Sequence, residues 1–167
     1  MLSTNLQAAF NDQINKELYS AYLYLGMSAW CEAANLAGSA RWLQAQAQEE
    51  QSHAMKFYGF VHDRGGKVIL EAIAKPAQEY ASLLDLFEQV LAHELKVTGL
   101  INGLYKAALA ESDYPAQVIL QWFINEQVEE EAWAAEMVGR VQNATCAGSV
   151  MDLDRHIDKL LGTDQGE

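Results

Sequence analysis

Four glutamates and one histidine in this 167-residue chain have the types and the spacing of ligands to metal ions. Each glutamate has apolar residues three, four and seven positions away, which on an α-helix places it on the apolar face. An ionised carboxylate inside an apolar core is strongly unfavourable without a counter-charge, so a group of them indicates bound cations. The residues are Glu17, Glu50, Glu94, Glu130 and His53.

The pattern is clearest around Glu94, because about 3.6 residues per turn put all of its apolar neighbours on one side of a helix. Those neighbours are Phe87, Val90, Leu91, Val97 and Ile101. The face around Glu130 is mixed, since Glu126 and Glu129 stand beside it. We therefore expect Glu94 to point inward, and the pattern constrains Glu130 least.

Glu50 and His53 are three residues apart, so on a helix their side chains stand on one face and can hold the same ion. Carboxylate oxygens with a single imidazole suit iron or manganese better than a tetrahedral zinc site. Four carboxylates and one histidine supply enough ligands for two ions only if one carboxylate bridges them. Glu50 is the expected bridge because it lies next to His53, and iron is the expected metal.

Helical periodicity dominates the chain, and no alternating segment is long enough to build a sheet, so the predicted fold class is all-α. The predicted helices cover residues 3–34, 36–64, 82–112, 113–143 and 149–161. Asn35 is the expected N-cap of the second helix, Gly65 and Gly66 end that helix, and Pro115 fits the first turn of the fourth. We expect residues 1–167 to form a single domain.

The lengths of the connections predict the arrangement of the helices. The first two helices, and the next two, are joined by a few residues, so each pair must be antiparallel. Residues 65–81 contain Pro76 and little helical pattern, and at about 3.3 Å per residue they reach roughly 50 Å, more than the ~42 Å of a helix of about 28 residues. The second and third helices can therefore run parallel in a four-helix bundle. Each glutamate falls near the middle of its own helix, so all four are expected at one level.

The composition of the chain limits the classes of partner that the protein is expected to have. The chain has 11 basic and 23 acidic residues, a formal net charge of -12, and no basic block that could follow a phosphate backbone, so nucleic acid is not an expected partner. No stretch approaches the ~20 apolar residues of a membrane span, and the start of the chain lacks the pattern of a secretory signal. We expect a cytoplasmic protein. Cys31 and Cys146 lack metal-ligand spacing and receive no role.

Three segments resemble the bacterial non-haem ferritins of the ferritin-like di-iron family, and the resemblance extends over essentially the whole chain, including a long crossover and a short fifth helix. The segments are residues 17–24, 47–54 and 126–131, which read ELYSAYLY, AQEEQSHA and EQVEEE. The resemblance implies an iron-storage protein with ferroxidase activity, which oxidises Fe(II) with O2 or H2O2 and deposits Fe(III) mineral inside a homo-oligomeric shell of about 24 subunits. Haem is not expected, because Gln51 stands where bacterioferritins carry the haem-ligating methionine.

The same resemblance implies roles for individual residues. The first iron would bind Glu17, Glu50 and His53. The second would bind Glu50, Glu94 and Glu130, with Gln127 beside it. A third iron would bind Glu49, Glu126 and Glu129 together with Glu130.

Aromatic residues near these ligands have two interpretations. Tyr24, two turns from Glu17 on the same face, is assigned by the resemblance to electron donation or to a hydrogen bond with an iron ligand. A buried tyrosine is more often a core residue with a satisfied hydroxyl. We expect Trp122 to be a packing residue and Glu131 to be solvated.

The sequence leaves two other functions open. A di-iron or di-manganese oxidase or peroxidase would use the same ligands without storing metal, and it would bind only about two ions per chain. A metal-free bundle that binds a partner would leave four carboxylates in the core without a role. Iron content per chain separates storage from the first of these.

Overall fold

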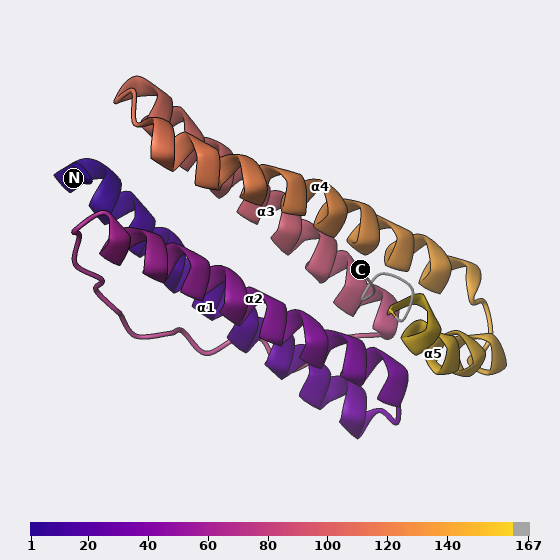
Figure 1. The fold of residues 1–167 in the computed structure, drawn as a ribbon. Helices are drawn as coiled ribbons and strands as arrows, with labels where there is room; N and C mark the ends of the chain where they lie inside the picture. The colour runs from indigo at the N-terminus through magenta and orange to yellow at the C-terminus, as the bar shows by residue number, and fades with distance from the viewer. Residues whose placement is uncertain (162–167) are drawn as a thin grey trace.

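The computed structural model describes residues 1–161, which form five α-helices and no strand (Figure 1). The helices are α1 (Thr4–Ala33), α2 (Ala37–Asp63), α3 (Leu83–Ala110), α4 (Tyr114–Asn143) and α5 (Ala147–Leu161). The predicted all-α fold class is confirmed, and the five helices occur in the predicted order. Within these residues, no helix combines the length and the apolar character that crossing a membrane would need.

Local capping explains where most helices begin. Ser3, Ser82 and Asp113 each precede a helix and accept a hydrogen bond from the backbone N–H three residues later. In α2 the N-cap position belongs to Leu36, whose side chain makes no hydrogen bond. The expectation that Asn35 caps α2 is therefore wrong.

Asn35 instead belongs to the end of α1. Its φ of 60° is left-handed, and the N–H of Leu36 donates to the carbonyl of Cys31 at 2.9 Å, which together form a Schellman turn. Asparagine tolerates this backbone conformation better than most residues do. Gly65 and Ser112, with φ of 70° and 54°, close α2 and α3 in the same way.

The long helices form two antiparallel hairpins, α1 with α2 and α3 with α4 (Figure 1). The crossover between α2 and α3 runs back along the first hairpin, so these two helices point in the same direction, as its length predicted. α5 lies across one end of the bundle and packs mainly against α2. This arrangement leaves the middles of all four long helices facing one interior.

The crossover is fastened to α1 by amide side chains. Three amides that lie four residues apart on α1 form hydrogen bonds of 2.7–3.0 Å with the backbone of every second crossover residue. The rise of four helical residues, about 6.0 Å, nearly matches that of two extended residues, about 6.6 Å, which keeps the contacts in register. The amides are Gln7, Asn11 and Asn15, and the backbone groups belong to Lys67, Ile69 and Glu71.

Two hydrophobic clusters fill the described part of the interior, one toward each end of the bundle. The first includes Tyr24, Met27, Leu43, Phe87 and Met137. The second includes Phe10, Phe57, Ile101, Leu120 and Phe123. On each of the four long helices, the glutamate singled out above lies between the stretches that contribute to the two clusters. The core is thus divided by a polar layer at the predicted level.

Candidate metal centre

The polar layer at mid-bundle consists of side chains that are almost completely removed from solvent. The glutamates and the histidine are between 1% and 8% exposed, and Glu130, on the mixed face, is the most exposed at 8%. The prediction that all four glutamates face inward is confirmed. The residues are Glu17, Glu50, His53, Glu94 and Glu130.

Two carboxylate oxygens in this layer are buried without a hydrogen-bond partner among the described residues: Oε2 of Glu17 and Oε2 of Glu50. The other oxygen of Glu17 accepts a hydrogen bond from Gln13 Nε2 at 2.9 Å. Nδ1 of His53 lies 3.7 Å from Glu50 Oε2, too far for a hydrogen bond but on the same side of α2. A buried acceptor without a donor costs about 1–3 kcal/mol, and a cation between these groups would remove that cost. The donor set therefore fits a metal ion.

Burial raises the pKa of each glutamate in the layer, because the charged form loses its hydration. Neighbouring carboxylates add to the effect: Glu50 raises the pKa of Glu17 further, and Glu94 does the same for Glu50. For Glu130, burial followed by the charge of Glu94 raises the pKa to about 9. Glu130 therefore retains a proton at neutral pH, and a cation that binds there must displace it.

Glu94 differs from Glu17 and Glu50 in having donors to both carboxylate oxygens. The hydroxyl of Tyr24 donates to Oε1, and Nε2 of Gln127 donates to Oε2 at 3.2 Å. Burial raises the pKa of Glu94, while these two hydrogen bonds act against that rise. Tyr24 is itself fully buried, and burial together with the Glu94 charge raises the pKa of its hydroxyl. Tyr24 therefore remains a protonated donor that holds Glu94 in place.

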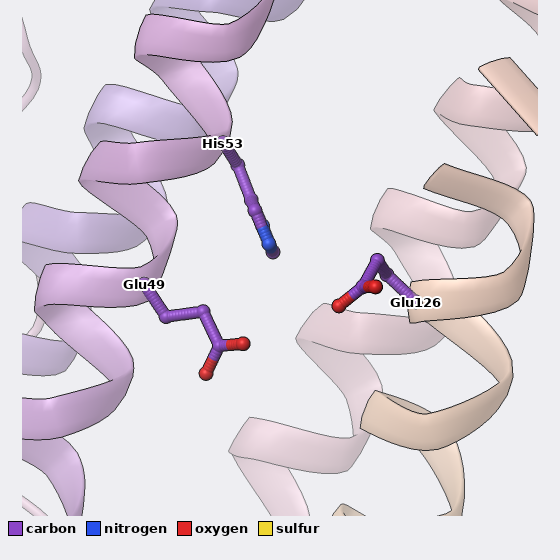
Figure 2. A group of neighbouring side chains, drawn as sticks. All are labelled: Glu49, His53 and Glu126. Atoms are coloured by element: carbon purple, nitrogen blue, oxygen red, sulfur yellow. The ribbon is translucent and has the colours of Figure 1, made fainter. Parts of the chain in front are cut away.

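A second group of possible ligands lies where α2 and α4 face each other (Figure 2). One ligand atom each from Glu49, His53 and Glu126 lies within 4.8 Å of the others, and Figure 2 shows the three side chains directed into a common space. Glu49 is exposed, His53 is buried and Glu126 is half-buried. Glu129 is exposed and lies outside this group. Within the part of the chain that the structure describes, His53 thus borders both groups.

The environment of His53 includes aromatic rings that the sequence assigned only to packing. The Trp122 ring meets His53 edge-on at a centroid distance of 5.4 Å, and Phe123 does so at 5.6 Å. The ammonium of Lys56 lies 3.1 Å above the Trp122 ring centroid. A cavity of about 580 Å³ reaches His53 along this side, lined also by Glu49. Trp122 is therefore a packing residue that also forms a wall beside His53.

Three side-chain pairs in or beside the layer were not predicted from the sequence. Gln13 precedes Glu17 by four residues, so its position on the same helix face was a usable signal. Glu49 and His53 are also four residues apart on one helix, so their proximity could have been predicted in the same way. Glu131 is half-buried and accepts a hydrogen bond from Thr98 of α3, so the expectation that it is a solvated residue is wrong. That contact joins two helices and could not be read from spacing.

Comparison with known proteins identifies relatives over nearly the whole chain. The family model described as a ferritin-like domain matches residues 7–144. The chain is 38% identical over 162 residues to a probable bacterial non-heme ferritin-like protein of Haemophilus influenzae, covering 97% of this chain and 96% of the relative. It is 40% identical over 142 residues to a bacterial non-heme ferritin of Campylobacter jejuni, covering 85% of each. Among solved structures, an open pore ferritin from the archaeon Archaeoglobus fulgidus matches with a TM-score of 0.92 and 40% identity, covering 94% of this chain and 98% of that one.

Proposed function

The chain belongs to the family of ferritin-like domains, and from this membership we propose that it stores iron and oxidises Fe(II) in the process. The observation that carries the proposal is the pair of buried carboxylate oxygens without donors, on Glu17 and Glu50, in a layer of further acidic groups. Curated relatives named non-heme ferritins support iron as the metal and a site without haem. We further propose that residues 1–167 act as one domain.

We assign two substrate iron ions to the mid-bundle layer, with Glu50 as the ligand that they share. One ion is held by Glu17, Glu50 and His53. The other is held by Glu50, Glu94 and Glu130, with Gln127 beside it. The separation of Glu50 Oε2 from His53 Nδ1, 3.7 Å, leaves both atoms free to face one ion. The two positions are unequal, because one includes an imidazole and the other has only carboxylates and an amide.

The chemistry of the layer follows from its protons and its charges. Two Fe(II) ions give up one electron each, which reduces O2 with two protons to H2O2, or H2O2 with two protons to water. The raised pKa values of Glu50 and Glu130 mean that metal binding releases protons inside the layer. We assign Tyr24 to the catalytic machinery, as the donor that fixes Glu94 and as an aromatic side chain in contact with a ligand of the second iron.

We assign the second group, Glu49 and Glu126 with His53 at its border, to a third iron on the way to the mineral. We assign Glu129 and Glu130 to the same third iron, as the resemblance implies, with the exposed Glu129 at its outer edge. Because His53 borders both groups, an ion moving outward would pass from one set of ligands to the next without leaving coordination. We propose that Fe(III) is then deposited within a homo-oligomeric shell of about 24 copies, closed by point-group symmetry.

Particle mass together with iron bound per chain tests this function. Sedimentation of the purified protein, followed by aerobic loading with excess Fe(II) and metal analysis, should give one large closed particle that holds many iron ions per chain. Saturation at two or three metal ions per chain, with no mineral, would indicate the di-iron or di-manganese oxidase or peroxidase instead. A protein that binds no metal would exclude both functions.

A further inference from the structure

Gln127 is held from the side of the bundle by two residues that the proposed function does not use. Its side chain is 4% exposed, and Nε2 donates to Oγ1 of Thr98 at 3.3 Å, to Oε2 of Glu94 at 3.2 Å and to the backbone carbonyl of Glu94 at 3.4 Å. Thr98 Oγ1 in turn donates to Oε1 of Glu131 at 2.5 Å. The four residues therefore form a chain of hydrogen bonds from the buried layer to the half-buried Glu131.

The spacing of these residues makes the chain a single unit. Thr98 follows Glu94 by four residues on α3, and Glu131 follows Gln127 by four residues on α4, so each pair occupies adjacent turns of one helix face. The hydrogen bonds cross between the helices at both turns. Thr98, Gln127 and Glu131 also line a cavity of about 190 Å³ between α3 and α4.

The direction of the hydrogen bonds fixes the orientation of the Gln127 amide. Thr98 has a single hydroxyl proton, and it donates that proton to Oε1 of Glu131. The Thr98 oxygen is then left to accept, and only the NH2 group of Gln127 can meet it. Oε1 of Gln127 takes no part in these hydrogen bonds and is the amide atom left for a cation, whereas a flipped amide would present N–H groups instead.

We infer that Thr98 and Glu131 are positioning residues for the second iron of the proposed site, because they hold the Gln127 oxygen available and keep Glu94 oriented. The inference rests on the proposed function. Residues that orient metal ligands typically change metal affinity by about 10–100-fold when removed. If the pair only joined α3 to α4, its loss would lower stability without distinguishing one metal position from the other.

Titration of the full-length, metal-free protein with Co(II) under anaerobic conditions tests the inference through its visible absorption. Co(II) ions at the two positions absorb differently, and we call the two sets of bands the first and the second class. Loss of one set in Glu17→Ala and of the other in Glu130→Ala shows which class belongs to the first and to the second position. Thr98→Val removes the hydroxyl at similar volume and should weaken the second class by about tenfold or more, with the first class unchanged. Thr98→Ser keeps the hydroxyl and should restore binding. Asn102→Ala, in the same cavity and outside the chain of hydrogen bonds, should bind as wild type.

Glu131→Ala gives an independent test. Glu131 is half-buried, and its replacement leaves the Thr98 hydroxyl in place, so this variant does not share the folding risk of Thr98→Val. Without its acceptor, Thr98 can donate to Oε1 of Gln127, so this variant should also lose affinity and alter the Co(II) spectrum of the second class. Equal weakening of both classes, or failure of Thr98→Ser to rescue, would overturn the inference while leaving the proposed function intact. A wild-type protein that binds fewer than two Co(II) ions per chain would overturn both.

Discussion

Carboxyl groups are buried in two parts of this molecule, and the two parts differ in how completely the carboxyl oxygens are hydrogen-bonded. Asp154 of α5 is 4% exposed, and both of its oxygens have donors: Gly38 N–H at 2.9 Å, Ser39 N–H at 2.8 Å and Ser39 Oγ at 2.7 Å. Glu17 and Glu50 are at least as deeply buried, and each retains one oxygen without a donor. Burial of an acid therefore does not by itself indicate a metal site. The oxygens of Glu17 and Glu50 that lack donors are the additional observation on which the proposed metal site rests.

The difference reflects what each carboxylate must satisfy. The N-terminus of α2 has backbone N–H groups without intrahelical partners, and Leu36 offers no side-chain cap. Asp154 supplies that cap from the other end of the sequence, where the positive end of the helix dipole also favours its charge. The fit is close: a Cβ on Gly38 would lie 1.8 Å from the Asp154 carbonyl oxygen, so only glycine allows α5 to approach. Asp154 thus stabilises the fold, whereas Glu17 and Glu50 each keep an oxygen that a bound cation would satisfy.

The largest difference between the layer and the Asp154 cap should come from Glu50→Leu. This change replaces the proposed shared ligand with an apolar side chain of similar volume. We expect the initial rate of Fe(II) oxidation to fall on the order of 100-fold, since both proposed iron positions lose a ligand. The metal-free variant should be more stable than wild type by about 1–3 kcal/mol, because a buried acceptor without a donor has gone. Stopped-flow absorbance with O2 and urea unfolding would measure the two effects. A wild-type oxidation rate would contradict the assignment of Glu50.

The pH dependence of stability in the metal-free protein should report the proton held by Glu130 in the layer. In Glu130 the pKa is raised from 4.5 to about 9, so the folded protein holds a proton that the unfolded chain has already released. The associated stability is complete below about pH 4.5 and is lost as the pH rises toward 9, at about 1.4 kcal/mol per pH unit.

Urea unfolding of the metal-free protein between pH 5 and pH 8, about the range in which this proton is retained, would measure the slope. Glu130→Gln lacks the proton and should be less dependent on pH by that amount, while keeping a similar side-chain volume. Parallel curves for wild type and Glu130→Gln would show that Glu130 is ionised in the folded protein.

Asp154→Ala should show the reverse of the Glu50 result. Removing the cap leaves the N–H groups of Gly38 and Ser39 buried without an acceptor, which costs about 1–3 kcal/mol of stability. Amide exchange in α5 and in the first turn of α2 should accelerate, while the initial oxidation rate stays at the wild-type value. Asp152→Ala, which removes an exposed acid from the same helix, is the matched control. Unchanged exchange in Asp154→Ala would mean that α5 is held by other contacts.

The sequence predicted the features that depend on neighbours along one helix. The inward glutamates and their common level followed from apolar periodicity and helix midpoints, and the structure confirms both. Asn35 was placed on the wrong helix because asparagine is common both as an N-cap and as the left-handed residue that ends a helix, and only the backbone conformation distinguishes the two. Thr98 with Glu131, and Asp154 with Ser39, join residues 33 and 115 positions apart, so no local pattern indicates them.

The smallest effect should come from Glu129→Gln, because its carboxylate is exposed and lies outside the group formed by Glu49, His53 and Glu126. Glu126 differs in being half-buried, and burial raises the pKa of its carboxyl group. Its carboxyl group is already turned toward His53 (Figure 2), so the substitution Glu126→Gln replaces an oxygen that faces the proposed ion. We expect Glu126→Gln to eliminate the third metal ion in a Co(II) titration and to slow repeated turnovers of iron oxidation. Glu129→Gln should reduce the affinity for that ion only severalfold, since an exposed carboxylate acts through a solvent-screened charge. Both variants should bind the first two ions as wild type does. An equal loss in Glu129→Gln would mean that Glu129 turns inward to bind the ion directly.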